Sequence, residues 1–290
     1  MRHGKYPFII GFLAVPLALY LVFVVGAYLQ MFQLSLTDWS GFGGFEYVGF
    51  DNFTKMWDDP VFWVALRHNL YLLVLLPVIT IALALFFAFL LNVGKLRGSR
   101  VYRVIFFFPQ LLALAIVAVI FGRVFGPDRS GMINGLFPDS WEPLLFLADE
   151  HWALACILAV LVWQAVGFYV VLFSAGMSAI SEDIYEAAAL DGAGKITLFF
   201  RITLPLLWNT LQVAWVYLGI AAFDAFALVN IMSVNHGGPG DATQVLSLQI
   251  YLNAFQNSQA GYASALGVVL FFLTLTFAAL TLRVTRRDTV

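Results

Sequence analysis

Residues 70–91 read LYLLVLLPVITIALALFFAFLL and carry no charged side chain. An α-helix advances about 1.5 Å per residue, so about 20 apolar residues cross a hydrocarbon core roughly 30 Å thick. This run is long enough to do so. A membrane-spanning strand is disfavoured, because it would alternate polar and apolar side chains over about ten positions. Residues 70–91 therefore predict a transmembrane α-helix, and with it an all-α membrane fold.

The whole chain has the composition of an integral membrane protein. Hydrophobic residues make up 62% of the 290 residues and charged residues only 11%, and the mean hydropathy is +0.89. Soluble domains contain far more charge. Five further uncharged runs are of similar length. We predict a single transmembrane domain, residues 1–290, with six helices at residues 8–29, 70–91, 104–121, 152–180, 204–223 and 262–282.

The placement of Lys and Arg predicts the orientation of the chain. Eleven of the fifteen lie in the amino-terminal tail, in residues 92–103, in the loop 181–205 and at the carboxyl end. The loops 30–69 and 122–151 carry five acids and two bases each, and residues 224–261 have no base. Cytoplasmic loops of membrane proteins are enriched in Lys and Arg. We therefore expect both termini in the cytoplasm, with the loop 181–205 on the same side.

The loop 181–205 differs from its surroundings because it combines charge, glycine and a helix-start signal. Ser181 is a good N-cap residue, and the acids that follow it suit the positive end of a helix dipole. The stretch SEDIYEAAALDGAG predicts a short helix that ends at Gly192 and Gly194. A second helix, KITLFFRITL, would lead to Pro205. The small side chains of the first helix would let another backbone approach closely, which favours a docking element.

A phosphate-binding loop is a weaker interpretation of the same segment. GAGKIT resembles the end of the motif G-x-x-x-x-G-K-[ST], which follows a strand. Ala189 stands where the first glycine is required, and Ile196 stands where a hydroxyl must bind magnesium. The segment before it is predicted to be a helix. We expect this chain to bind no nucleotide.

The residues of this loop resemble the EAA motif of binding-protein-dependent ABC importer permeases. Glu186-Ala187-Ala188 is followed by Gly192 and then, after nine residues, by the ITLP of residues 202–205. The segments LSLTDW, GFDNF, FFFPQ and GGPGDAT resemble the first membrane subunit of the carbohydrate-uptake class, of the maltose, glycerol-phosphate and chitobiose type. The resemblance runs from about residue 8 to residue 287. It leans toward importers of chitobiose or N-acetylglucosamine.

The resemblance implies a type I ABC importer permease fold and a role as half of a sugar translocation path in the bacterial plasma membrane. It implies three kinds of partner: a second permease subunit in a heterodimer, two cytoplasmic ATPase subunits and an extracytoplasmic substrate-binding protein. ATP and magnesium would bind to the ATPase subunits, so this chain would hold no cofactor and would not be an enzyme. The loop 181–205, called the coupling loop below, would enter a groove on an ATPase subunit.

The resemblance also implies roles for five residues of the coupling loop. Glu186 would be the acidic contact to the ATPase. Ala187, Ala188 and Gly192 would allow a close fit and a sharp turn between the two short helices, and Asp191 would support that turn. An ordinary amphipathic helix resting on lipid headgroups is the alternative. Such a helix carries Lys and Arg on its polar face, whereas this face is acidic.

A self-sufficient channel or secondary transporter for small polar solutes is the rival function. Such proteins carry ionisable pairs across mid-membrane helices, or inverted repeats with broken helices. The predicted spans show one acid, Asp224, and no convincing internal repeat. We therefore favour the importer subunit.

Polar and aromatic side chains in the fourth and fifth spans are candidates for the substrate path. An unpaired Asp near the middle of a membrane costs about 2.5 to 3.5 kcal/mol on insertion scales, so Asp224 needs a partner or water. Substrate contact and structural hydrogen bonding are both open for it. Gln side chains can bond sugar hydroxyls and aromatic rings can stack on sugar rings, although such residues also form interfacial belts and join helices. The further candidates are Trp163, Gln164, Phe168, Tyr169, Trp215, Tyr217 and Asn230.

The chain lacks the patterns of a metal site or an enzyme. Cys156 is the only cysteine, and the four histidines, at positions 3, 68, 151 and 236, are scattered without metal-ligand spacing. No Ser-His-Asp or H-E-x-x-H arrangement is present in the sequence. We expect no catalytic residue and no bound metal.

Overall fold

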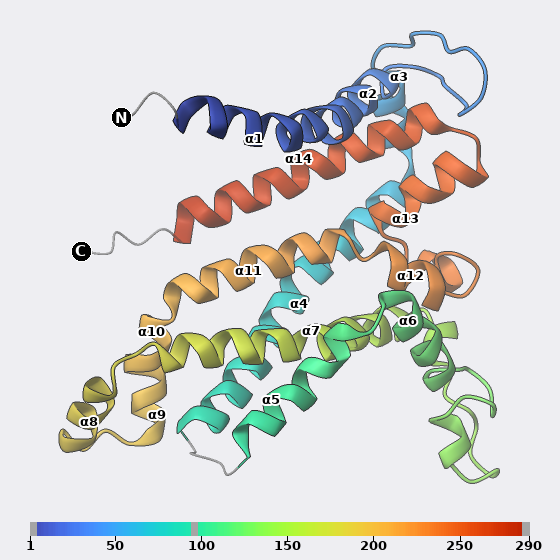
Figure 1. The fold of residues 1–290 in the computed structure, drawn as a ribbon. Coiled ribbons are helices and arrows are strands. Elements are labelled where there is room, and N and C mark those ends of the chain that lie inside the picture. Colours follow the sequence, from blue (N-terminus) through green and yellow to red (C-terminus); the bar gives the residue numbers. More distant parts are fainter. Residues whose placement is uncertain (1–4, 94–97, 286–290) are drawn as a thin grey trace. The chain divides into compact units, whose positions relative to one another are not determined.

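The computed structural model describes residues 5–93 and 98–285 (Figure 1). Within these ranges the regular structure is helical, and Thr37 and Tyr47 form an isolated bridge, so the predicted all-α fold is confirmed. The chain divides into two compact units, one running up to Phe62 with Gln249–Phe272, the other formed by Trp63–Leu248 with the chain from Leu273 onward. Five basic residues used to predict the orientation lie outside the described residues: Arg2, Lys95, Arg97, Arg286 and Arg287.

The first unit begins with one long helical segment. It runs from α1 (Lys5–Tyr20) through a π-helical turn (Leu21–Val25) to α2 (Gly26–Leu34). The predicted span 8–29 lies within it. A stretch without regular structure then leads to α3 (Asp51–Asp58), and the unit also contains the π-helical turn Leu252–Gln256 and the first turns of α14 (Ala260–Thr285).

Side-chain hydrogen bonds fix α3 within the first unit. The amide nitrogen of Asn52 donates to the carbonyl oxygens of Ser35 and Thr37 at 2.9 and 2.7 Å. The hydroxyl of Tyr262, at the start of α14, donates to the Asp59 carboxylate at 2.8 Å. These bonds give the irregular segment after α2 a defined path, because its backbone oxygens have side-chain partners.

The second unit holds most of α4 (Pro60–Val93), the whole of α7 (Ala153–Ser178) and α11 (Trp208–Phe223), and the second half of α14. Its shorter helices are α5 (Ser99–Phe107), α6 (Leu114–Val124), α8 (Glu182–Leu190), α9 (Lys195–Leu198), α10 (Leu204–Leu206) and α12 (Phe226–Met232). The short helix α13 (Leu246–Tyr251) follows, and α5 packs against α7 while α12 packs against α6 and α7.

Four helical segments of the described chain are each long and apolar enough to cross a membrane: Gly11–Leu34, Pro60–Asn92, Ala153–Ser178 and Ala260–Thr285. Two bent pairs reach that length only together. Ser99–Leu111 and Leu114–Val124 meet at 95°, and Lys195–Leu206 and Trp208–Phe223 meet at 73°. Six crossings therefore result only if each bent pair is counted as one.

The third predicted span, residues 104–121, is not the continuous helix that the sequence indicated. The chain passes from α5 into a 3₁₀ turn at Phe108–Leu111, and Leu112 and Ala113 are then extended before α6 begins. Pro109 lies in that 3₁₀ turn and cannot donate a backbone hydrogen bond, which weakens the helix there. In the fifth span, the bend at Leu207 separates α10 from α11, so the predicted segment 204–223 is not straight either.

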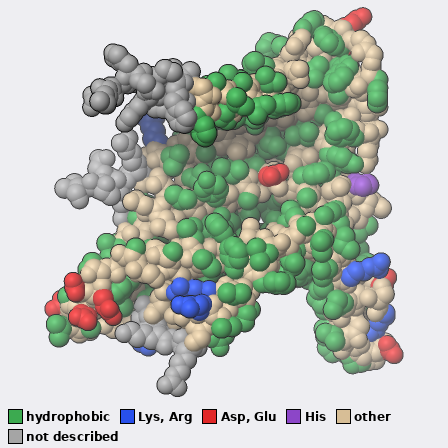
Figure 2. Space-filling view, in the orientation of Figure 1, with side chains coloured by type: hydrophobic (Ala, Val, Ile, Leu, Met, Phe, Trp, Pro, Cys, Tyr) green, Lys and Arg blue, Asp and Glu red, His purple; other side chains and the backbone are tan. Residues whose placement is uncertain are grey.

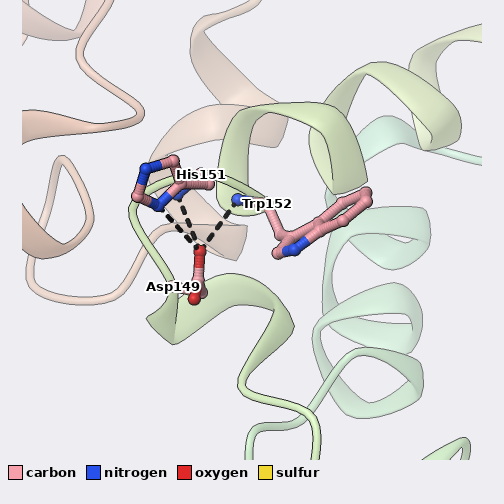
Figure 3. Close-up of polar contacts among 3 residues, drawn as sticks. All are labelled: Asp149, His151 and Trp152. Atoms are coloured by element: carbon pink, nitrogen blue, oxygen red, sulfur yellow. Dashed lines mark hydrogen bonds and ion pairs between the residues drawn. The ribbon is translucent and has the colours of Figure 1, made fainter.

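The start of α7 is fixed by the Asp149 carboxylate. One of its oxygens accepts hydrogen bonds from the backbone N–H groups of His151 and Trp152 at 2.8 and 3.2 Å (Figure 3). Nδ1 of the exposed His151 ring lies 3.6 Å from the same oxygen. These bonds satisfy the amide groups of the turn that leads into α7, whose N-cap residue is Trp152. The Asp149–His151 pair is thus part of a helix start.

The close approach of α5 to α7 depends on Gly167. A Cβ atom added at this position would overlap the carbonyl oxygen of Phe106. Side chains on α7 around this point, such as Val170 and Phe173, are fully buried. Small residues at a helix interface let two backbones come together, which maximises van der Waals contact where lipid supplies no hydrophobic drive.

Gly167→Ala is expected to destabilise the folded protein by about 1 to 3 kcal/mol, because the added methyl group forces α5 and α7 apart. The midpoint of thermal unfolding in detergent would measure the effect. Gly122→Ala on α6 is the matched control, since a Cβ there meets no atom within 4 Å. Equal stability of the two variants would contradict this close packing.

Candidate functional site

The coupling loop folds as two short helices beyond the carboxyl end of α7 (Figure 1). α8 ends at Leu190, and Gly192 adopts the left-handed conformation with φ +78°. The N–H of Gly192 donates to the Ala189 carbonyl at 3.1 Å, and the N–H of Ala193 donates to the Ala188 carbonyl at 2.9 Å. This pair of bonds is a Schellman motif, which glycine favours because it has no Cβ. The predicted helix end at Gly192 is confirmed, whereas Gly194 instead precedes α9.

The start of α8 differs from the prediction in its detail. Ser181 occupies the N-cap position, but its hydroxyl donates to the Asp183 carboxylate at 3.3 Å and caps no backbone amide. The acids of the first turn, Glu182 and Asp183, are present as expected. They favour the positive end of the helix dipole. The helix start therefore rests on charge more than on a serine cap.

The side chains of α8 divide into an inward and an outward face. Ala188 is 7% exposed and packs within this chain, so it lies apart from the exposed positions expected at a contact surface. Glu186, Ala187 and Leu190 are exposed and share one face, because residues three and four apart are neighbours on a helix. Asp191 and Gly192 are exposed at the turn that follows. Acidic side chains gather at the corner of the molecule that α8 occupies (Figure 2).

Leu190 is the feature of this loop that the sequence reasoning missed. Its side chain is 90% exposed, although it is large and apolar. It follows Glu186 by four residues and so projects beside that carboxylate. The available signal was the leucine that ends the small-residue run EAAAL, at the position before the predicted turn. Single exposed leucines are common on protein surfaces, so Leu190 is of interest because of its place beside Glu186 and before the turn at Gly192.

The eight candidates for the substrate path lie on α7, on α11, at Asp224 directly after α11, and on α12. α7 packs against both α11 and α12, so the structure brings these elements together. Tyr169 is buried. Gln164 and Trp215 are half-buried, and Tyr217 is exposed.

Other candidates have partners within the chain. The Trp163 ring packs on Phe121 with centroids 4.9 Å apart, and the Phe168 ring lies 5.2 Å from that of Tyr169. Asn230 Oδ1 lies 3.3 Å from His236 Nδ1, within hydrogen-bond reach. These contacts hold the side chains in place and leave their roles toward a ligand untested.

Asp224 is the residue at which α11 ends. Its backbone N–H still bonds to the helix, to the carbonyl oxygens of Ile220 and Ala221 at 3.2 Å each. Its side chain is exposed in this chain, and its carboxylate has no hydrogen-bond or ion-pair partner among residues 5–93 and 98–285. The predicted need for a partner or water at Asp224 is thus not met by the described part of the chain itself.

The segment after Asp224 is held by a residue that was not predicted, Asn69 of α4. This side chain is 0% exposed. Its amide nitrogen donates to the carbonyl of Ala222 at 3.1 Å, and its oxygen accepts from the N–H of Leu246 at 2.8 Å. It therefore satisfies backbone groups at the end of α11 and at the start of α13. The neighbouring His68 places Nδ1 2.9 Å from the carbonyl oxygen of Gln244.

The glycine-rich turn lies between these fixed points. Gly237, Gly238 and Gly240 all have positive φ angles, which glycine adopts without steric cost because it has no Cβ. A Cβ on Gly240 would press against the Glu150 carboxylate, so the turn also packs closely. The GGPGDAT segment is therefore a packed turn at the end of the α11–α12 region. Among the described residues, no group of three or more His, Cys, Asp or Glu side chains could hold a metal ion.

Comparison with known proteins places the chain among transporter subunits. No protein-family profile matches it. A diacetylchitobiose uptake system permease protein of Streptomyces coelicolor is 40% identical, over 99% of this chain and 84% of that protein. A sulfoquinovosyl glycerol transport system permease protein of Agrobacterium fabrum is 35% identical, over 94% of this chain and 87% of that protein.

Solved structures share the fold. A chain of a bacterial ABC transporter that imports the acidic polysaccharide alginate superposes with a TM-score of 0.83 at 21% identity, and covers 100% of this chain and 99% of that one. A chain of the alginate transporter in complex with a pentasaccharide-bound periplasmic protein gives a TM-score of 0.86 at 20% identity, over 99% and 96%. With curated relatives of 32 to 40% identity over 91 to 99% of this chain, among them a probable ABC transporter permease protein of Bacillus subtilis, the chain belongs to the family of ABC transporter permeases, and it is a membrane transport subunit and not an enzyme.

Proposed function

We propose that this permease subunit forms half of the translocation path of an ATP-driven sugar importer in the bacterial plasma membrane. The observation that carries the proposal is the coupling loop. This acidic loop follows the apolar helix α7 and contains α8 and α9, joined by a tight turn at Gly192. It exposes Glu186, Ala187 and Leu190. The named substrates of two relatives, diacetylchitobiose and sulfoquinovosyl glycerol, support a carbohydrate as the transported solute.

The proposed assembly has a second permease subunit, two ATPase subunits and an extracytoplasmic binding protein. A structural neighbour was solved with a pentasaccharide-bound periplasmic protein, which supports a binding protein as the source of substrate. ATP and magnesium would bind to the ATPase subunits, and this chain would hold neither. The distribution of Lys and Arg supports cytoplasmic termini and a cytoplasmic coupling loop at residues 181–205.

The exposed face of α8 is suited to a groove with an apolar floor and a basic rim. Leu190 would fill the floor, where burial of one leucine side chain yields about 1.5 to 3 kcal/mol. Glu186, one turn earlier, would meet a cation at the rim and fix the register. Ala187 would allow a close backbone approach. Ala188 would act from within, by packing α8 onto its own chain.

Coupling follows from the two states that uphill transport requires. The importer must have an inward-facing and an outward-facing state. ATP bound to the ATPase subunits must favour one of these states, and so must the loaded binding protein. We propose that the coupling loop moves with the ATPase and carries α7 with it. The candidates on α7, α11 and α12 would then change their access to the two sides. Within this path, Asp224 would bond sugar hydroxyls or water, and the aromatic rings would stack on sugar rings.

A reconstitution experiment tests the function as a whole. The chain, its partner permease and the ATPase subunits are placed in vesicles with the binding protein, and uptake of a labelled oligosaccharide is measured. We expect co-purification of the ATPase, and uptake that stops when the ATPase is inactivated. Uptake that continues without ATP hydrolysis would instead support a self-sufficient channel or secondary transporter.

Gly192→Pro is expected to abolish uptake while membrane insertion is retained. Proline holds φ near −65° and lacks an N–H, whereas Gly192 has φ +78° and donates to Ala189. Uptake and the amount of protein in the membrane fraction are measured together. Gly194→Pro is the matched control, because Gly194 already has φ −70°. Normal uptake in the Gly192 variant would count against the assignment of this turn.

Leu190→Ser is expected to weaken binding of the ATPase subunit by about thirtyfold, equivalent to about 2 kcal/mol. The dissociation constant is measured with the purified ATPase and the permease heterodimer in nanodiscs. Ile196→Ser is the control: Ile196 is 76% exposed, but it lies on α9 and lines an apolar groove against α4. If both variants bind as tightly as the wild type, Leu190 is not an anchor.

A further inference from the structure

The inner ends of three helices meet at one amide side chain, that of Asn92. Asn92 lies one residue before the end of α4, and its nitrogen donates to the Ala88 carbonyl of the same helix at 2.7 Å. Its oxygen accepts from Arg103 Nη2 of α5 at 2.8 Å. The same oxygen is 3.4 Å from the hydroxyl of Ser178, the last residue of α7. These contacts all lie within the second unit.

The guanidinium of Arg103 depends on this amide. Arg103 is half-buried, and its Nε atom is buried without a hydrogen-bond partner. No carboxylate of the described chain forms an ion pair with it. A charged donor removed from water needs an acceptor, and hydrogen bonds to charged groups are stronger than those between neutral groups. The Asn92 oxygen is therefore the contact that holds Arg103 against α4.

The position of this cluster relates it to the coupling loop. The N-cap residue of α8, Ser181, follows Ser178 by three residues. The single hydroxyl hydrogen of Ser178 is shared between two acceptors, the Ser174 carbonyl of α7 at 2.9 Å and the Asn92 oxygen at 3.4 Å, so the bond to its own helix is the stronger and the one to Asn92 the weaker. A displacement of α8 reaches α7 through this short connection, and it reaches α11 through α9 and α10 on the other side of the loop. The cluster lies at the base of that connection and bonds it to α4 and α5.

We propose that Asn92, Arg103 and Ser178 form a clamp that makes α4, α5 and α7 move as one body when the coupling loop moves. The proposal rests on the proposed function, and it assigns these three as positioning residues for coupling. Without the clamp, the end of α7 moves with the ATPase while α4 and α5 lag behind. ATP is then hydrolysed with less solute transported, because the two sites no longer bias one shared two-state element.

The test measures solute transported per ATP hydrolysed in the complete reconstituted importer. Asn92→Leu keeps the size of the side chain and removes the acceptor. We expect the ratio to fall about fivefold, within the range by which coupling residues act, with ATPase binding unchanged. Asn92→Asp restores an acceptor and adds an ion pair to Arg103, so we expect a ratio near that of the wild type. Arg100→Leu is the control. Arg100 lies at an exposed position on α5, the helix that carries Arg103, and we expect this variant to leave the ratio unchanged.

A second set of variants covers the case in which Asn92→Leu does not fold. Ser178→Ala removes one hydroxyl, and Arg103→Gln keeps a donor while removing the charge. Each is expected to lower the ratio of solute transported to ATP hydrolysed about twofold. The Ser178→Ala/Arg103→Gln double variant is expected to lower it no more than the stronger single variant, because both side chains act through the Asn92 amide. A wild-type ratio in all of them, or an equal loss in Asn92→Asp, would overturn the clamp. Uptake that needs no ATPase, or an ATPase that does not bind, would instead overturn the proposed function.

Discussion

A backbone amide or carbonyl inside a hydrocarbon core has no water to bond, and this constraint governs where the chain can bend. Through most of the described length it is met by unbroken helices such as α4, α7 and α14. Where α11 ends and α13 begins, the backbone groups of Ala222 and Leu246 would be left free. The Asn69 side chain is the hydrogen-bond partner of both groups, and it is fully buried in that position. The irregular segment after Asp224 is thus tolerated because another helix supplies the missing bonds.

The coupling loop is under a weaker constraint, because the charge pattern predicts that it lies in water, where backbone groups can bond to solvent. Its backbone turns sharply at Gly192, and the Schellman bonds close α8 within the loop itself. The loop can therefore be short and carry acidic side chains on its surface. Leu190 departs most from this polar character, since its large apolar side chain is 90% exposed. In the proposed contact with the ATPase, Leu190 would contribute apolar burial and Glu186 would fix the register.

Movement of the coupling loop can reach the membrane helices only if the loop is firmly attached to them. The backbone connection from Ser178 to Ser181 supplies one attachment. The close contact at Gly167 fixes α5 to α7 farther along, and the amide of Asn92 joins the inner ends of three helices. The coupling loop and the packed helices behind it therefore form one connected path to the candidates on α7, α11 and α12.

The sequence by itself determined the membrane class, the approximate helices and the turn at Gly192, because hydropathy over about 20 residues and the need for a positive φ are local properties. The resemblance of residues 186–205 to a family motif added the coupling role. Only the tertiary structure decided that residues 104–121 bend, that Ala188 faces inward while Leu190 faces outward, and that Asn69 and Asn92 join helices distant in sequence. These features depend on which side of each helix meets another helix, and in lipid both sides are apolar, so the pattern of hydrophobic residues does not reveal it.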